Sequence, residues 1–244
     1  MPESISEQLI AAARALASSV DALRFSAPVT HVYNPLDYAW PAHEEYLRRF
    51  AGSRKRILFV GMNPGPFGMV QTGIPFGEVP SVRDWMEIHA PIGHPPREHP
   101  KRPVLGFACP RCEISGQRLW GLFAKRFGAA RDFFQEHFVV NYCPLAFLEG
   151  SGRNLTPDKL WKAESEQLFA ACDAHLRRVI QILQPEWIVG VGGFALERIR
   201  HVHTGTLPRV TTILHPSPAS PAANRNWAEL ATRQLEECGA WGRS

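Results

Sequence analysis

Four short apolar runs alternate along the chain with longer segments whose apolar residues recur every three or four positions. Short apolar runs bounded by turn residues are typical of buried strands, and the longer spacing is typical of amphipathic helices. The predicted strands are residues 57–60, 138–140, 187–191 and 210–214. Because strands and helices alternate, we expect an α/β fold with three αβα layers. Its central four-stranded sheet should be mainly parallel, with helices on both faces.

The helices are predicted from apolar spacing between capping residues. Ser4 and Glu7 make a capping box at the start of the first helix, residues 4–24. The other predicted helices are residues 41–50, a short helix capped by Ser81 and Asp84, residues 115–128, a long helix from Thr156 to Pro185, residues 193–202 and residues 221–237. Residues 89–111 lack this spacing and are expected to form an irregular surface excursion.

The 244 residues show no internal repeat, linker or low-complexity tract. We therefore expect one domain over residues 1–244, with the N-terminal helix packed on it. The net charge of +4 is mildly basic, which is compatible with a polyanionic partner but does not establish one.

The sequence also bears on the compartment. Met1-Pro2-Glu3-Ser4 does not begin a basic stretch followed by an apolar one, so no signal peptide is expected. No apolar run approaches the roughly 20 residues that span a membrane. Five cysteines, an odd number without an export signal, favour reduced thiols. We expect a cytoplasmic protein, in the bacterial cytosol or nucleoid, or in the nucleus of a eukaryote.

A glycine-rich loop follows the first predicted strand. Residues 61–69, GMNPGPFGM, contain three glycines and two prolines, which forbid a regular element and indicate a tight loop. In open α/β sheets, ligands bind at the carboxyl ends of the strands. Asn63 is the short polar side chain within this loop, so we expect it to face whatever the loop holds.

Polar side chains follow three of the four strands. Asn63 follows the first, Asn141 the second and His215 the fourth. Taken singly, each asparagine is more often a turn-former, and the histidine is as often structural as functional. Parallel strands bring their carboxyl ends to one edge, so the three together predict a shared crevice. No carboxylate directly follows these strands, which argues against a strong base or a carboxylate pair.

The motifs resemble those of a known enzyme family. Gly61 to Gly77 (GMNPGPFGMVQTGIPFG), Asn141 to Leu145, and His215 to Pro218 with Asn224 are similar to the single-strand-selective monofunctional uracil-DNA glycosylases. These enzymes form a branch of the uracil-DNA glycosylase superfamily. The likeness runs in order from about residue 26 to residue 239 and includes residues 151–157. The parallel sheet between helices in that superfamily agrees with the fold predicted above.

The resemblance implies an enzyme that flips deoxyuridine out of DNA and cuts its N-glycosidic bond, leaving an abasic site. Asn63 should position the attacking water in a largely dissociative reaction. His215 should donate to uracil O2 as charge grows on the departing base. Asn141 should read the uracil edge, donating to O4 and accepting from N3–H, a pattern that cytosine reverses.

The same resemblance assigns the remaining base contacts. Phe76 should stack on the flipped ring, although by itself it is equally compatible with a core aromatic residue. Met62 and Gly65 should line the floor beneath the base through backbone groups, and Met69 is also expected to contact the base. In this family a glycine in that loop leaves room near C5, so 5-hydroxymethyluracil and similar oxidised pyrimidines should enter.

Residues 216–221 should form a wedge that presses into the DNA. By resemblance, the DNA-contacting residues are Ser217, Pro218, Ala219, Ser220, Asn224 and Arg225. Family members often carry a long cationic residue where this chain has Ala219, a departure that bears on duplex penetration rather than on the chemistry. The basic excursion at residues 97–111 is a weaker candidate for phosphate contacts, through Arg97, Lys101 and Arg102.

No metal or cofactor is expected. Cys109 and Cys112 form a single CxxC pair, and the other cysteines lack the paired spacing of a zinc or iron–sulfur site. The glycine loop lacks the Gly-Lys-Ser/Thr ending of a phosphate loop, which leaves a nucleotide cofactor unsupported. No lysine is placed by a motif as a Schiff-base nucleophile, so the enzyme should be monofunctional.

The expected partner is single- or double-stranded DNA that contains uracil or a modified uracil. We expect a monomer with no membrane association and no obligate protein partner. Two alternatives remain open from the sequence. One is a related glycosylase with shifted base choice, such as xanthine or hypoxanthine. The other is a nucleic-acid-binding module that keeps the pocket without turnover.

Overall fold

A computed structural model describes residues 3–242 of the chain. Met1-Pro2, considered above for a signal peptide, and Arg243-Ser244 lie outside the described residues. The strands are β1 (Val29–Tyr33), β2 (Ile57–Gly61), β3 (His137–Asn141), β4 (Ala146–Glu149), β5 (Asn154–Leu155), β6 (Trp187–Val191) and β7 (Arg209–Ile213). The α-helices are α1 (Ile5–Asp21), α2 (Pro35–Tyr38), α3 (Trp40–Phe50), α4 (Met69–Thr72), α5 (Ile114–Phe127), α6 (Ala130–Glu136), α7 (Lys162–Leu183), α8 (Gly193–Val202) and α9 (Ala223–Glu237). Short turns of other helix types are η1 (Ser81–Trp85), η2 (Gly106–Ala108) and η3 (Pro157–Lys159).

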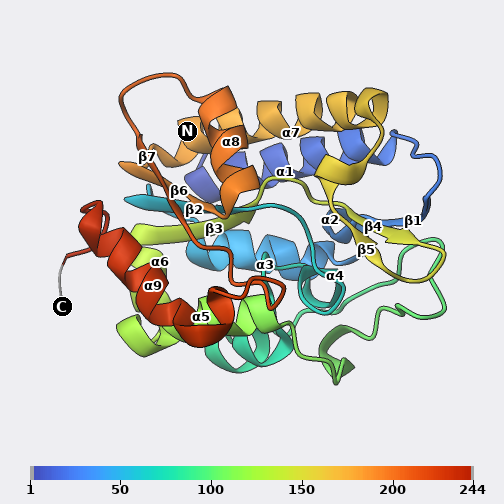
Figure 1. Cartoon of the computed structure of the whole chain (residues 1–244), viewed down its shortest axis with the longest axis horizontal. Coiled ribbons are helices and arrows are strands. Elements are labelled where there is room, and N and C mark those ends of the chain that lie inside the picture. The colour runs from blue at the N-terminus through green and yellow to red at the C-terminus, as the bar shows by residue number, and fades with distance from the viewer. Residues whose placement is uncertain (1–2, 243–244) are drawn as a thin grey trace.

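The central sheet contains the four predicted strands in the order β3-β2-β6-β7, and every pairing is parallel. Figure 1 shows α1, α7 and α8 on one side of this sheet and α5, α6 and α9 on the other. All residues of β2 and β6 are buried, as expected for strands covered on both faces. The predicted three-layer α/β fold is confirmed.

The N-terminal helix begins as predicted. The side chain of Ser4 accepts a hydrogen bond from the backbone N–H of Glu7. The apolar stripe of α1, which includes Leu9, Leu16 and Val20, is buried where the helix packs against α7 and α3. The helix ends at Asp21, slightly before the predicted residue 24.

Two predictions made from capping residues are wrong, although a short helix does begin at Ser81. Thr156-Pro157 begins only the single turn η3, because the chain becomes extended again at Leu160, and α7 begins later, at Lys162. Ser81 and Asp84 do not cap η1 through their side chains. The Ser81 hydroxyl donates to Glu78 and the Asp84 carboxylate pairs with Arg83, so both side chains are engaged elsewhere.

A second sheet was not predicted from the sequence. It is antiparallel, in the order β1-β4-β5, and lies at one end of the molecule beside α2 and α4 (Figure 1). Its strands are short, and polar residues interrupt the apolar pattern of β1, so no clear period marks them. Strand β4 of this sheet begins directly after Leu145, so the sheet holds the end of the segment that connects β3 to β4.

Residues 89–111 are irregular, as predicted, apart from η2 and an isolated bridge between His99 and Arg102. Tyr33 of β1 anchors this excursion. Its hydroxyl donates to the carbonyl of Arg102 at 2.8 Å and accepts from the backbone N–H of His99 at 2.6 Å. The excursion is therefore held against the second sheet.

Candidate active site

The glycine loop runs from the carboxyl end of β2 to α4. At Gly61 a Cβ atom would lie 2.4 Å from Asn141 Oδ1 and 2.4 Å from the Phe76 ring, so no side chain fits there. The loop closes on itself, because the backbone N–H groups of Gly68 and Val70 both donate to the carbonyl of Gly65. Glycine is required where backbone and side chains approach this closely.

A cleft of about 390 Å³ opens over this loop. The residues that line it come from the glycine loop, from the segment after α4, from α5 and the residue before it, from β5 and the residue after it, and from the segment after β7. They are Met62, Asn63, Gly65, Pro66, Gly68, Met69, Phe76, Glu113, Ser115, Asn154, Thr156, His215, Ser217 and Pro218. The cleft thus brings together most of the residues that the resemblance assigned to the base pocket.

The Asn63 amide has a defined orientation. Its Nδ2 donates to the backbone carbonyl of Leu145 at 3.2 Å. This contact uses the donor side of the amide and leaves Oδ1, an acceptor, for the cleft. The contact comes from the segment between β3 and β4, which sequence reasoning did not connect with Asn63.

His215 is held as a neutral imidazole. Burial lowers the pKa of His215 to about 4, so the ring is uncharged at neutral pH. The backbone N–H of Ser217 donates to Nδ1 at 3.1 Å, which requires that nitrogen to be unprotonated. The proton of the neutral ring is therefore on Nε2, which is a hydrogen-bond donor.

The residues around His215 and Phe76 are tightly constrained. Gly192, at the end of β6, has a φ of 92°, and a Cβ there would lie 3.0 Å from His215 Cβ. Phe76 also has positive φ, 53°, an uncommon conformation for a phenylalanine. Its carbonyl accepts a hydrogen bond from Trp120 Nε1 at 3.1 Å, and its ring centroid is 6.2 Å from that of His215. Strained backbone of this kind is concentrated at functional sites.

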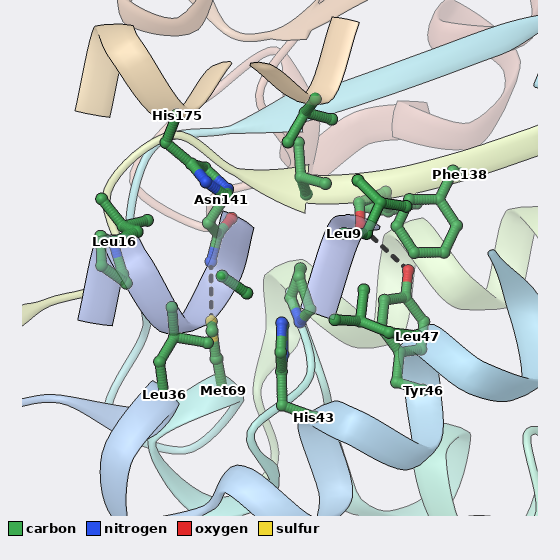
Figure 2. Close-up of a pocket in the computed structure, with 16 residues that line it drawn as sticks. Leu9, Leu16, Leu36, His43, Tyr46, Leu47, Met69, Phe138, Asn141 and His175 are labelled. Atoms are coloured by element: carbon green, nitrogen blue, oxygen red, sulfur yellow. Dashed lines mark hydrogen bonds between the residues drawn. The ribbon is translucent and has the colours of Figure 1, made fainter. Parts of the chain in front are cut away.

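Asn141 does not line the cleft itself, although it contacts Met69, which does. Its Nδ2 contacts Met69 Sδ at 3.3 Å, as Figure 2 shows, and sulfur is a weak acceptor. Within residues 3–242, the buried Oδ1 atom has no hydrogen-bond partner. Beyond Asn141 is an interior cavity of about 30 Å³ whose lining includes His43 and His175 (Figure 2). The amide therefore has a free acceptor and an easily replaced contact to sulfur.

Glu113 is a cleft residue that sequence reasoning missed. It stands just before α5, far in sequence from the strand ends, and its carboxylate lies against Gly65 and Gly68. Burial raises the pKa of the Glu113 carboxyl, and the backbone N–H groups of Phe67 and Ser115 partly offset this rise. No local motif marks this position, because the fold alone brings it to the glycine loop.

The loop after His215 is braced from α5. Arg118 donates to the carbonyl of Pro216 at 3.0 Å and to Asn224 Oδ1 at 2.9 Å. Asn224 Nδ2 in turn donates to the carbonyl of Pro218 at 2.8 Å. The side chain of Asn224, predicted to contact DNA, thus supports the loop, and Arg118 is a second residue that sequence reasoning missed.

The other predicted DNA-contacting residues lie at different places. Ser217 and Pro218 line the cleft, and Ala219 and Ser220 continue the exposed turn beyond it. Arg225 lines a separate hollow on the surface of α9. In the basic excursion, the Arg102 guanidinium lies 5.5 Å from the ring centroid of Phe67, while Arg97 contacts the carbonyl of Thr30.

All five cysteines are free, including Cys109 and Cys112. Within residues 3–242, no three His, Cys, Asp or Glu side chains are grouped so that they could hold a metal ion. In the same part of the chain, no helix has the length and apolar character to cross a membrane.

Comparisons with known proteins agree with this geometry. The Uracil DNA glycosylase superfamily profile matches residues 49–236. The single-strand selective monofunctional uracil DNA glycosylase of Mus musculus is 50% identical over 226 residues, covering 92% of this chain and 81% of the mouse protein. That of Bos taurus is 47% identical over 240 residues, covering 98% of this chain and 88% of the bovine protein.

A solved structure supports the fold alone. The crystal structure of wild-type SMUG2 from Pedobacter heparinus matches with a TM-score of 0.70 at 16% identity, covering 98% of each chain. The region that matches the superfamily profile contains Asn63, Asn141 and His215. The chain therefore belongs to the single-strand selective monofunctional uracil-DNA glycosylases, within the uracil DNA glycosylase superfamily.

Proposed function

We propose that this protein is a DNA repair glycosylase that flips uracil out of DNA and hydrolyses its N-glycosidic bond, leaving an abasic site. The observation that carries the proposal is the pairing of two oriented groups in one cleft. His215 presents Nε2–H as a donor, and Asn63 presents Oδ1 as an acceptor. A donor for the leaving base and an acceptor for a water are the two groups that this hydrolysis needs.

The bond breaks toward a sugar with oxocarbenium character and a uracil that gains negative charge. His215 Nε2–H donates to uracil O2 as that charge grows, and such preorganised donation contributes about 10²–10³ in rate. Asn63 Oδ1 accepts a hydrogen bond from the attacking water and directs it to the sugar carbon. A neutral amide is a poor base, but an oxocarbenium needs little help from a base.

Base choice follows from Asn141 and Phe76. Uracil replaces the contact between Asn141 and Met69, so that Nδ2 donates to O4 while the unpartnered Oδ1 accepts from N3–H. Cytosine presents the opposite pattern and would leave both amide atoms badly paired. Phe76 stacks on the ring, and Met62 with Gly65 forms the floor.

We further propose that 5-hydroxymethyluracil and similar bases are accepted, because glycine at position 65 provides no side chain next to C5. The substrate is single- or double-stranded DNA, and the protein acts as a monomer without an obligate protein partner in the cytoplasm, nucleoid or nucleus. The loop formed by Pro216 to Pro221 fills the gap that the flipped base leaves in the DNA.

The test measures base excision from labelled oligonucleotides, both single- and double-stranded, in the presence of EDTA. Alkali then cleaves the strand at each abasic site, so that excision can be quantified. The panel contains uracil, 5-hydroxymethyluracil, xanthine, hypoxanthine, thymine and cytosine. We expect uracil to be released and cytosine to be retained. Preferential release of xanthine or hypoxanthine would replace the proposal with shifted base choice. Failure to release any base while DNA binding persists would indicate a silent binding module.

The same assay tests the two catalytic assignments. Asn63→Ala and His215→Leu should each lower the single-turnover rate on uracil by about 10²–10³ while DNA binding persists. His94→Leu, which changes an exposed histidine outside the cleft, is the matched control. Rates equal to wild type in both cleft variants would contradict the roles given to Asn63 and His215.

A further inference from the structure

Two guanidinium groups lie over one aromatic ring beside the cleft. The central carbon of the Arg111 guanidinium is 4.7 Å from the ring centroid of Phe67, and that of Arg102 is 5.5 Å from it. Pro66 and Gly68, the neighbours of Phe67 in the glycine loop, both line the cleft. The glycine loop therefore has two cations next to the cleft, and we call Arg102 and Arg111 the arginine pair.

The arginine pair has no acidic partner. Within residues 3–242, neither guanidinium forms an ion pair, and the side-chain hydrogen bond that the pair does make runs from Arg102 Nη1 to the carbonyl of Lys101 at 2.8 Å. The nearby carboxylate of Glu113 instead accepts from backbone N–H groups of the glycine loop and of α5. Two cations held close together repel each other, so binding of an anion between them is favoured.

The backbone holds the arginine pair in place before any ligand binds. The N–H of Arg102 donates to the carbonyl of His99 at 2.8 Å, and its own carbonyl accepts from the Tyr33 hydroxyl at 2.8 Å. Arg111 lies just before α5, which begins at Ile114. Because the contacts with the aromatic ring also restrict both side chains, little conformational freedom remains to be lost on binding.

Phosphate is the anion that a DNA strand supplies at this place. Guanidinium N–H groups match phosphate oxygens in geometry, and the resulting charge-assisted hydrogen bonds are strong. When a base enters the cleft, the phosphates next to its sugar stay at the edge of the cleft, beside the arginine pair. Arg97, a cation of the same excursion, is less suited because it donates to the backbone carbonyl of Thr30.

We propose that Arg102 and Arg111, held on Phe67, form a phosphate-binding site that contacts the DNA backbone next to the flipped nucleotide. This inference rests on the proposed function and determines where the strand runs as it leaves the cleft. The site acts on binding, and cleavage of the glycosidic bond remains the task of Asn63 and His215.

The experiment measures binding to two single-stranded oligonucleotides of equal length, one with a stable abasic-site analogue and one undamaged, between about 50 and 200 mM salt. The variants are Arg102→Gln, Arg111→Gln and the double variant. Arg111→Lys keeps the charge but loses the planar stacking on Phe67. Arg131→Gln, whose side chain is 85% exposed on α6, is the matched control for the loss of one positive charge.

We expect each glutamine variant to bind the abasic-site oligonucleotide about 3- to 10-fold more weakly and to reduce the slope of log Kd against log salt by about 1. The loss should be smaller on undamaged DNA, because a nucleotide in the cleft is what brings its phosphates to the arginine pair. Arg111→Lys should keep the wild-type slope and lose part of the affinity. The single-turnover rate on uracil at saturating enzyme should stay at the wild-type value in all variants.

Two results would overturn the proposal. Affinities and slopes equal to those of Arg131→Gln would show that the arginine pair does not bind phosphate. Equal losses on abasic-site and undamaged DNA would show a general attraction away from the flipped nucleotide. Wild-type protein that binds DNA but releases no uracil would instead refute the proposed function, and the binding measurements do not depend on turnover.

Discussion

His215 illustrates how the environment of one residue sets its chemistry. The backbone N–H of Ser217 holds Nδ1 as an acceptor, and burial keeps the ring neutral. An imidazolium would carry a proton on Nδ1, facing that N–H, and would lose the hydrogen bond. The donor that we propose for the leaving base is therefore neutral, and its direction is fixed before the substrate binds.

A neutral donor has a characteristic pH dependence. Because the pKa of His215 is lowered to about 4, the active neutral form persists as the pH falls through 6.5. The single-turnover rate on uracil should be level from pH 8 to about 5 with respect to this group, and should fall as the pH approaches 4. A rate that rises as the pH decreases through 6.5 would show that the imidazolium is the donor.

At the scale of single residues, the structure also explains what sequence reasoning missed. Asn63 and His215 were predicted because each lies two residues after the end of a strand, a position that can be counted along the chain. Glu113 and Arg118 belong to the start of α5 and reach the site through space. Their distance in sequence from any strand end removes the signal that identified the others.

At the scale of elements, α5 supports both sides of the cleft. At its start, Glu113 meets the glycine loop, and one turn later Arg118 holds the loop after β7. Between them, Gly116 lies so close to the Phe76 carbonyl that a Cβ would approach it to 2.0 Å. This helix therefore sets the distance between the glycine loop and the loop that follows β7.

Removing the brace from α5 should weaken DNA engagement. Arg118→Met loses the hydrogen bonds to Pro216 and Asn224 but keeps an apolar stem. We expect weaker binding to abasic-site DNA and a several-fold lower excision rate, because the loop must then be ordered on binding. Binding is measured by titration with labelled oligonucleotides, and thermal unfolding checks the fold.

Lys125→Met, on the same helix and exposed, controls for the loss of one positive charge. Asn224→Ala should resemble Arg118→Met, and the double variant should be little worse than either single one, because both act through one contact. Equal effects of Lys125→Met and Arg118→Met would indicate a general electrostatic contribution instead of loop support.

At the scale of the whole molecule, buried histidines connect stability to pH. Burial lowers the pKa values of His43 and His137 to about 4, well below the ordinary value of 6.5. Both side chains are less than one-tenth exposed, at 7% and 1%. As the pH falls, these histidines become protonated in the unfolded chain at a higher pH than in the folded protein. Their contribution to stability is therefore complete above pH 6.5 and is lost as the pH falls toward 4.

The free energy of unfolding should therefore decrease between pH 7 and pH 5, by roughly 1–2 kcal/mol for each of these histidines. Urea denaturation at several pH values measures it. His43→Gln should show a flatter dependence on pH than wild type, whatever its absolute stability. His94→Gln, at an exposed position, should keep the wild-type slope, and an unchanged slope in His43→Gln would contradict the argument.

The sequence by itself determined the central sheet, the glycine loop and the three polar residues that follow the strands. Apolar runs and alternation are local properties, and parallel pairing carries the strand ends to one edge, so these features can be read in order along the chain. The family resemblance rests on the same local motifs and is confirmed by the matched relatives.

Only the tertiary structure decided the second sheet, the start of α7 and the surroundings of the site. The site depends on contacts between residues far apart in sequence, made by Leu145, Glu113 and Arg118. The neutral state of His215 depends on its burial. Burial, hydrogen-bond direction and close approach are properties of packed neighbours. They exist only when the chain has folded, and the orientation of Asn63 and His215 depends on them.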